Sequence, residues 1–194
     1  MNCKNLKYLL VLFSIFYTCV SFTQTTSQKS GPDNPTKLIQ YVTDETGTLT
    51  PAQISSLNSK LINEDKTSSN QILVYMIPGL EGESLEDISI RLAEKNKIGK
   101  KDKNNGVLIL IVKNDRKIRI EVGYGLEGVL TDAKSSSIIR NDITPSFKSG
   151  NYYEGINKGV DAVISVIKGE YTADKKKDDQ NGGCCFGIPI FIII

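Results

Sequence analysis

The sequence predicts an α/β fold, a three-layer αβα sandwich in which a small mixed sheet carries helices on both faces. Three segments support this prediction. Residues 72–77 form an apolar run of strand length between two segments of helical periodicity. Residues 107–112 are uniformly apolar, as expected for a strand that is covered on both faces. Residues 118–122 alternate between apolar and polar side chains after a short turn, which predicts a hairpin strand.

The connections between these segments predict the direction of the strands. The runs at 72–77 and 107–112 are expected to be parallel, because a helix separates them, and to be joined by a right-handed crossover. A short strand within residues 38–42 is expected to add an edge. The sheet is therefore predicted to be mixed, with the hairpin strand antiparallel to its neighbour.

The first two helices carry recognisable start signals. One begins after the N-cap Thr50, with Pro51 at its first position and Gln53 completing a capping box. The other begins after the N-cap Ser84 and is expected to end at Gly99. Their apolar faces, which are predicted to be buried, consist of Ile54, Leu57 and Leu61 in the first helix and Leu85, Ile88 and Leu92 in the second.

Two further helices are predicted after the hairpin. Asp132 is expected to cap the first of them, which bends or breaks at Pro145. The second begins at Asn151 and ends at Gly169. The residues predicted to be buried are Ile138, Ile139 and Ile143 in the first helix and Ile156, Val160, Val163, Ile164 and Ile167 in the second.

The N-terminus has the composition of a secretory signal. Lys4 and Lys7 precede an apolar run at 8–17, and small and polar residues follow at 18–24. The run is shorter than the roughly 20 residues of a transmembrane helix, although an uncleaved anchor and a lipidated Cys19 are alternatives. The protein is therefore expected to be exported and to work in the periplasm or cell envelope. The predicted parts of the chain are a signal peptide (1–24), a flexible linker (25–35), one folded domain (36–171), a polar spacer (172–183) and an apolar tail (184–194).

The apolar tail is too short to cross a bilayer as a helix and too hydrophobic to be stable in water. Contact with a membrane is the interpretation that we favour. A partner-binding strand and the beginning of a longer span are the alternatives.

Composition excludes several classes of function. The formal net charge is +2, and basic residues are mixed with acidic ones, so no nucleic-acid partner is indicated. The chain has no histidine, which excludes Ser-His and Cys-His catalysis and histidine-ligated metals. Its four cysteines lie in the signal and the tail, so the domain is expected to fold without disulfides.

A glycine-rich segment at 123–128 follows the hairpin strand and leads toward the next helix. Glu127 and Asp132 place two carboxylates there, and carboxylate and carbonyl oxygens are the ligands that Ca²⁺ and Mg²⁺ prefer. The alternative is a tight connection between a strand and a helix, without any ligand. A nucleotide-binding loop is disfavoured, because no Lys-Ser or Lys-Thr pair follows the glycines.

Several motifs in order make the sequence resemble the TPM domain family, which occurs in exported bacterial proteins and in thylakoid-lumen repair proteins of plants. The match extends from about Tyr41 to Gly169. The motifs are VTDETGTLT at 42–50, NGVLIL at 105–110, DRKIRIEVGYGLEG at 115–128, TD at 131–132 and ITPSF at 143–147.

The resemblance implies a Rossmann-like αβα sandwich and, for some members, binding of Ca²⁺ or Mg²⁺. It makes Asp44, Glu127 and Asp132 the candidate metal ligands, with Asn105 as a further oxygen donor. Strand directions nevertheless place Asp44 near the opposite end of the sheet from Glu127, and the alternative ligands are Asp102 and Asp115.

The resemblance also implies two alternative functions. The one that we favour is an exported cation-binding module with an accessory or interaction role at the cell envelope, for example in membrane-protein maintenance. Its partner would be an unidentified envelope or membrane protein. The other is a metal-assisted acid phosphatase. In that case Asp44 or Asp132 would act on the phosphoester, with Arg119 or Arg140 as the stabilising cation.

Overall fold

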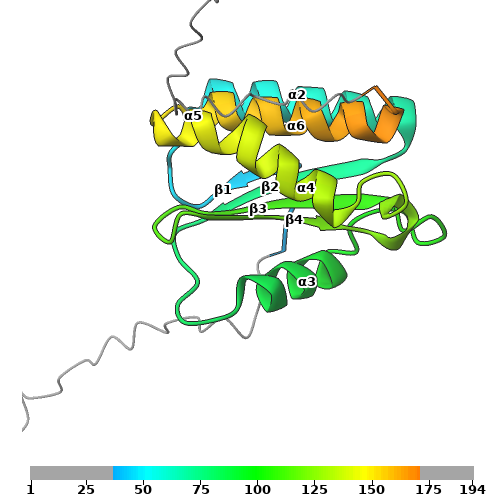
Figure 1. Ribbon diagram of the computed structural model, residues 1–194, viewed down its shortest axis with the longest axis horizontal. Helices are drawn as coiled ribbons and strands as arrows, with labels where there is room; N and C mark the ends of the chain where they lie inside the picture. The colour runs from blue at the N-terminus through cyan, green and yellow to red at the C-terminus, as the bar shows by residue number, and fades with distance from the viewer. Residues whose placement is uncertain (1–36, 171–194) are drawn as a thin grey trace, which may run out of the picture. The chain divides into compact units, whose positions relative to one another are not determined.

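The computed structural model describes residues 37–170, which form a four-stranded sheet between two layers of helices (Figure 1). The strands lie in the order of the sequence: β1 (Val42–Asp44), β2 (Gln71–Ile77), β3 (Gly106–Val112) and β4 (Lys117–Val122). The first three are parallel, and β4 is antiparallel to β3. The predicted αβα sandwich with a mixed sheet is thereby confirmed.

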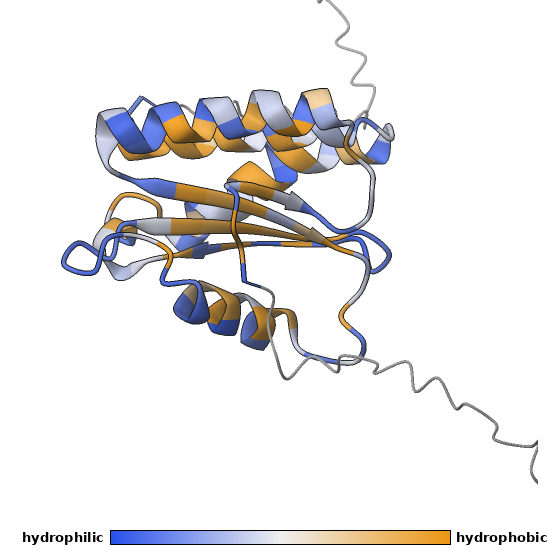
Figure 2. Cartoon of the chain, turned by 180° about the vertical axis from the view of Figure 1, so that it is seen from behind, coloured by the Kyte–Doolittle hydropathy of each residue, from blue (hydrophilic) through white to orange (hydrophobic). Residues whose placement is uncertain are grey.

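Helices cover the two faces of the sheet unequally. α2 (Pro51–Ser68), α4 (Asp132–Ile138) and α6 (Tyr152–Lys168) pack on one face, whereas α3 (Leu85–Lys95) covers the other. Figure 2 shows that the apolar residues of these helices are turned toward the sheet. The faces that point outward are mainly polar.

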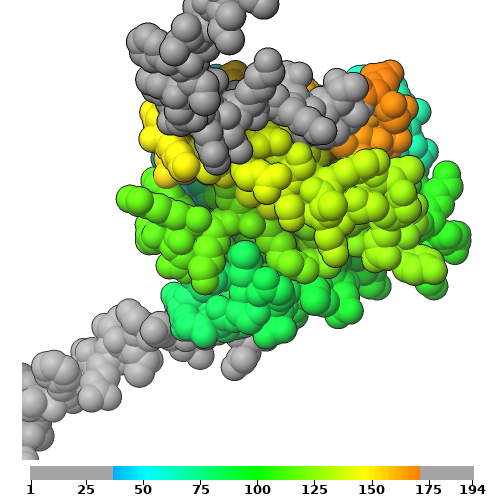
Figure 3. Space-filling view, in the orientation of Figure 1, coloured from blue at the N-terminus to red at the C-terminus, as the bar shows by residue number. Residues whose placement is uncertain are grey.

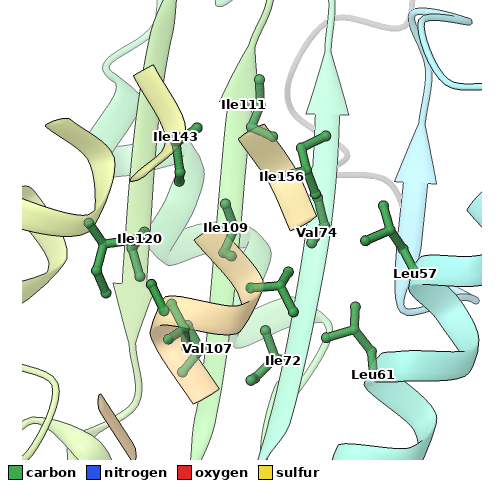
Figure 4. Packing of buried hydrophobic residues seen from close by; sticks show 14 of the residues in the cluster. Leu57, Leu61, Ile72, Val74, Val107, Ile109, Ile111, Ile120, Ile143 and Ile156 are labelled. Atoms are coloured by element: carbon green, nitrogen blue, oxygen red, sulfur yellow. The ribbon is translucent and has the colours of Figure 1, made fainter. Parts of the chain in front are cut away.

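The core follows the alternation of side chains along the strands. Ile72, Val74 and Met76 of β2 belong to the larger cluster under α2 and α6, while Leu73, Tyr75 and Ile77 belong to the smaller one over α3. Every residue of β3 is buried, as its uniformly apolar sequence predicts. Figure 4 shows side chains of the larger cluster between the sheet and the helices.

The first two helices begin where the capping signals predict. The Thr50 side chain accepts a hydrogen bond from the Gln53 amide, the reciprocal bond of the capping box is present, and the Ser84 side chain accepts from the Asp87 amide. The predicted end of α3 is wrong. Asn96 ends the helix by donating its side-chain amide to the Leu92 carbonyl at 2.9 Å, so Gly99 lies in the loop that follows.

The segment after β4 differs from the prediction in two ways. Thr131, and not Asp132, is the N-cap of α4, because its side chain accepts from the Lys134 amide. The helix is also interrupted before Pro145, by a π-helical turn, η2 (Ile139–Ile143), that leads into the short helix α5 (Thr144–Lys148). The Thr144 amide and hydroxyl both donate to the Ile139 carbonyl, so the backbone widens one residue before the proline.

The predicted edge strand lies later in the chain than expected, at Val42–Asp44 instead of within 38–42. Tyr41 pairs through its carbonyl, which accepts from the Val74 amide, but Leu38 packs against the cluster over α3.

The two crossovers have opposite hands, because α2 and α3 lie on opposite faces while β1, β2 and β3 follow in order. The crossover through α3 is right-handed, as predicted. The crossover through α2 is left-handed, which is rare. Figure 4 shows this arrangement, with β1 to the right of β2 when the sheet is seen from the side of α2 and α6.

The predicted signal peptide, linker, spacer and tail all lie outside residues 37–170. Within the part of the chain that the structure describes, no helix has the length and hydrophobicity that crossing a membrane requires.

Candidate functional site

The glycine-rich segment is held against the loop that precedes β3. The Gly123 amide donates to the Gly106 carbonyl at 2.8 Å, and the Gly125 amide donates to the Asn104 carbonyl at 3.1 Å. A Cβ atom on Gly125 would lie 1.9 Å from the Lys103 carbonyl oxygen, and one on Gly123 would lie 2.2 Å from the Asn104 oxygen. Both glycines are therefore required by close backbone packing. This agrees with the alternative interpretation of the segment, as a tight structural connection.

This packing leaves several side chains of the connection exposed. The 3₁₀ turn η1 (Tyr124–Leu126) buries Leu126 and leaves Tyr124 80% exposed. Glu127 directly follows this turn, and Asp132 is the first residue of α4. Both carboxylates are exposed at the surface.

Glu127 and Asp132 line one hollow of about 320 Å³ beside β4. Glu121 and Arg119 of β4 and the hydroxyl-bearing Thr131 also line it. The structure therefore brings together two of the four candidate ligands and adds a third carboxylate, Glu121, that the sequence analysis did not select.

Arg119 and Glu121 belong to a network under α3. The Arg119 Nε donates to Glu121 Oε2 and to the Ser89 Oγ, both at 2.9 Å, and Ser89 is fully buried. The Ser89 hydroxyl also lies 2.9 Å from Glu121 Oε2, and Glu86 Oε1 lies 3.6 Å from Arg119 Nη1. The network holds Glu121 in place at the hollow and occupies one of its two oxygens. Alternation along β4 could have indicated that Arg119 and Glu121 share a face, but not that Ser89 lies between them.

Asp44 lies far from this hollow. It ends β1, at the edge of the sheet opposite β4, and three strand spacings of about 4.8 Å separate the two edges by about 14 Å. Its carboxylate accepts hydrogen bonds from the Thr46 amide and hydroxyl and from the Leu49 amide. Burial raises the pKa of Asp44, but these bonds and one from the Thr48 backbone outweigh it, so the net pKa lies below its ordinary value.

Asn105 is buried, and its side-chain amide is fully used within the fold. Its Oδ1 accepts from the Lys100 amide at 3.0 Å, and its Nδ2 donates to the Ser69 carbonyl at 2.6 Å and to Asn70 Oδ1 at 3.1 Å. These contacts tie the loop before β3 to the end of α2. Asn105 thus lies apart from the residues that line the hollow.

The alternative ligands are separated as well. Asp115 Oδ2 accepts from the Leu80 amide at 3.0 Å, at the carboxyl ends of β2 and β3. Asp102 is exposed in the loop before β3. Within residues 37–170, no three acidic side chains lie close enough together to hold a metal ion as they stand.

Comparison with known proteins identifies a family. The sequence model of the TPM domain, named TPM phosphatase, matches residues 42–166. Among proteins with curated descriptions, none matches the chain significantly.

Solved structures also match. The N-terminal domain of a protein from P. gingivalis, solved in solution by NMR, is 39% identical, with 67% of this chain and 83% of that one covered and a TM-score of 0.62. The BA42 protein of Bizionia argentinensis is 22% identical, with 68% and 90% covered and a TM-score of 0.56. The N-terminal domain of the cg2496 protein of Corynebacterium glutamicum is 14% identical, with 75% and 88% covered and a TM-score of 0.52. The last two similarities show the fold alone.

Proposed function

Because the chain belongs to the TPM domain family, we propose that it is a binding module that takes up Ca²⁺ or Mg²⁺ at the hollow beside β4. The observation that supports this proposal is the meeting of Glu121, Glu127 and Asp132 around one hollow. Carboxylate oxygens suit both of these cations. Asp44 and Asn105 do not fit the same site, since their polar atoms are engaged elsewhere in the fold.

The proposed site is open and only partly assembled. Glu127 and Asp132 would supply the principal charges, and water would complete the coordination of the cation, because Glu121 already binds Arg119. An open site with few protein ligands binds weakly, with a Kd of about 10⁻⁴–10⁻³ M, as extracellular calcium sites do. Such a site would be occupied outside the cytoplasm, where we propose that the protein is exported.

A titration of the full chain with Ca²⁺ and Mg²⁺ tests this proposal. The NMR amide shifts are monitored in a non-ionic detergent during the titration. We expect shifts concentrated in residues 121–132 and a Kd in the stated range. Glu127→Gln and Asp132→Asn should each weaken binding by about tenfold, through the loss of one of two principal ligand charges. Glu81→Gln, which changes an exposed acid in the loop between β2 and α3, is the matched control and should leave the Kd unchanged. Shifts that are absent, or equal losses in all three variants, would refute the site.

An accessory role at the cell envelope follows from the same proposal, with an envelope or membrane protein as the partner. The apolar residues 184–194 would keep the domain near a membrane. Fractionation of cells that express the chain with and without these residues tests this part. We expect the shortened chain to leave the membrane fraction, and an unchanged distribution would exclude the tail as the cause of association.

One observation favours the phosphatase as a second candidate. Asp132 and Arg119 line the same hollow, so a carboxylate and a cation are both available to a phosphoester there. Arg119 is, however, already paired with Glu121 and near Glu86. Hydrolysis of a generic phosphoester that requires a divalent cation and is lost in Asp132→Asn would establish the enzyme. Turnover that persists in this variant would place any activity elsewhere.

A further inference from the structure

A second hollow, of about 370 Å³, lies at the other end of β4. Its walls are the end of β3, the β3–β4 turn and the short helix α5. In Figure 3 the turn (green) and α5 (yellow) form the left side of the molecule. The hollow lies at the carboxyl end of β3, and the carboxyl ends of parallel strands are where open α/β sheets usually bind their ligands.

The charged side chains that line this hollow are all basic. Lys113 and Arg116 come from the turn, Lys117 begins β4, and Lys148 comes from α5. None of the ion pairs within residues 37–170 includes any of them. The acid in the same turn, Asp115, accepts from the Leu80 amide and does not line the hollow. No acidic side chain is among the lining residues, although Lys117 also lies near Glu86, on the side of β4 that carries Arg119 and Glu121.

The rest of the lining is apolar and aromatic. Phe147 and Tyr152 lie with their ring centroids 4.8 Å apart, and Ile118 of β4 also lines the hollow. The Lys113 Nζ lies 5.7 Å from the centroid of the Tyr152 ring. This cation–π contact holds the half-buried lysine against the aromatic side of the hollow. The hollow therefore joins a cationic rim to an apolar wall.

Two irregularities of the backbone shape this hollow. Arg116 has a φ of +53°, a left-handed conformation that is costly for a residue with a side chain. The π-turn η2 ends directly before Thr144, and with α5 it places Thr144, Phe147 and Lys148 at the hollow. Strained residues and π-turns both occur preferentially at functional sites.

We propose that this hollow binds a phosphate group carried on an apolar body, either a soluble phosphate ester or the headgroup of an anionic lipid. A phosphate offers up to two negative charges and several acceptor oxygens, which match several basic side chains better than a single carboxylate does. The apolar body would lie against Phe147 and Tyr152. The proposal concerns binding at this hollow. This hollow is separate from the proposed cation site, and the test of the phosphate proposal does not depend on cation binding.

Phenyl phosphate and inorganic phosphate are the soluble probes. We expect phenyl phosphate to shift the amides of residues 111–118 and 144–152 in the full chain, and to bind about tenfold more tightly than inorganic phosphate, because half of its ring would leave water. Added salt should weaken the binding of both probes. The variant Lys113→Gln with Lys148→Gln should bind at least about tenfold more weakly, since it loses two charge-assisted contacts. The matched control removes two exposed lysines elsewhere, by Lys66→Gln with Lys101→Gln, and should bind as the parent does.

Co-sedimentation with phosphatidylcholine vesicles, with and without phosphatidylglycerol, distinguishes the two sources of phosphate. Tight binding of phenyl phosphate without a preference for phosphatidylglycerol indicates a soluble ester. A preference for phosphatidylglycerol that the pocket variant loses and the control variant keeps indicates a lipid headgroup. The proposal is overturned if neither probe binds, or if the pocket variant and the control variant behave alike. The melting temperatures of both variants check that each is folded.

Discussion

Asp44 illustrates how one acidic residue of a family motif can serve the fold instead of a ligand. Its carboxylate receives the Thr46 amide and hydroxyl and the Leu49 amide, at distances of 2.6–2.8 Å, and so closes the turn between β1 and α2. A carboxylate with its lone pairs so engaged would have to give up these bonds to bind a cation. The stabilisation of the turn is therefore the role that its geometry supports.

Asp44→Asn should lower the free energy of unfolding by about 2 kcal/mol at neutral pH, because the hydrogen bonds lose their charged acceptor. The pKa of Asp44 is lowered in the folded state, so its contribution is present above the unfolded value of about 3.9 and is lost as the pH falls through the lower folded value. Urea unfolding at pH 7 and at pH 3 measures this effect. The difference in free energy of unfolding between variant and parent should be smaller at pH 3 than at pH 7. Cation binding at residues 121–132 should be unaffected, and its loss in this variant would contradict the structural role.

Tyr41 supplies a prediction at alkaline pH. Its hydroxyl donates to Asp65 Oδ2 at 2.6 Å, and this bond, together with burial and the Asp65 charge, raises the pKa of Tyr41 to about 12. The stabilisation is complete below the ordinary value of 10.0 and is lost as the pH rises toward about 12. Tyr41→Phe should cost about 1 kcal/mol at neutral pH and should remove this part of the alkaline dependence. Urea denaturation of parent and variant between pH 9 and about 12 measures the cost at each pH and its loss at alkaline pH. Phenolate absorbance follows the ionisation of Tyr41 as a second readout. A parent and variant that lose stability in parallel would contradict the prediction.

At the scale of elements, the glycines of the segment at 123–128 have different roles. A Cβ on Gly125 would lie 1.9 Å from a backbone oxygen of the neighbouring loop, whereas a Cβ on Gly128 would meet nothing within 4 Å. Gly125→Ala should therefore destabilise the protein by about 2–3 kcal/mol, by separating the connection from the loop before β3. Gly128→Ala is the matched control and should change the stability by less than about 0.5 kcal/mol. Thermal unfolding of both variants tests the difference, and equal effects would refute close packing as the reason for Gly125.

Elements with local signals were predictable from the sequence. Thr50, Pro51 and Gln53 begin α2 through contacts within one turn, and the uniformly apolar β3 is buried on both faces. The π-turn was not predictable, because it depends on the Thr144 amide and hydroxyl both donating to the Ile139 carbonyl, and no local motif indicates this geometry. The cap of α4 was misassigned by one residue, since Thr131 and Asp132 are both good caps and only geometry selects between them.

At the scale of the whole molecule, the order of the strands determines which candidate ligands lie together. Glu127 and Asp132 are close in the chain, and local turns suffice to bring them to one hollow. Asp44 reaches the far edge of the sheet because the crossover through α2 is left-handed, against the general preference. The basic hollow is assembled from the β3–β4 turn and α5, which are distant in the sequence and which no local motif connects.

The last prediction concerns the extent of the folding unit. The buried residues of both core clusters lie between Val42 and Val166, the partly buried residues packed against them extend from Leu38 to Ile167, and the family match covers 42–166. A relative with 39% identity is folded in solution as an isolated N-terminal domain. Residues 36–171 alone should therefore unfold in one cooperative transition, within about 2 °C of the melting temperature of the full chain, because no core side chain is lost. Calorimetry of the two chains in the same detergent measures this. A fragment that melts many degrees lower, or without cooperativity, would show that residues outside this range contribute to the core.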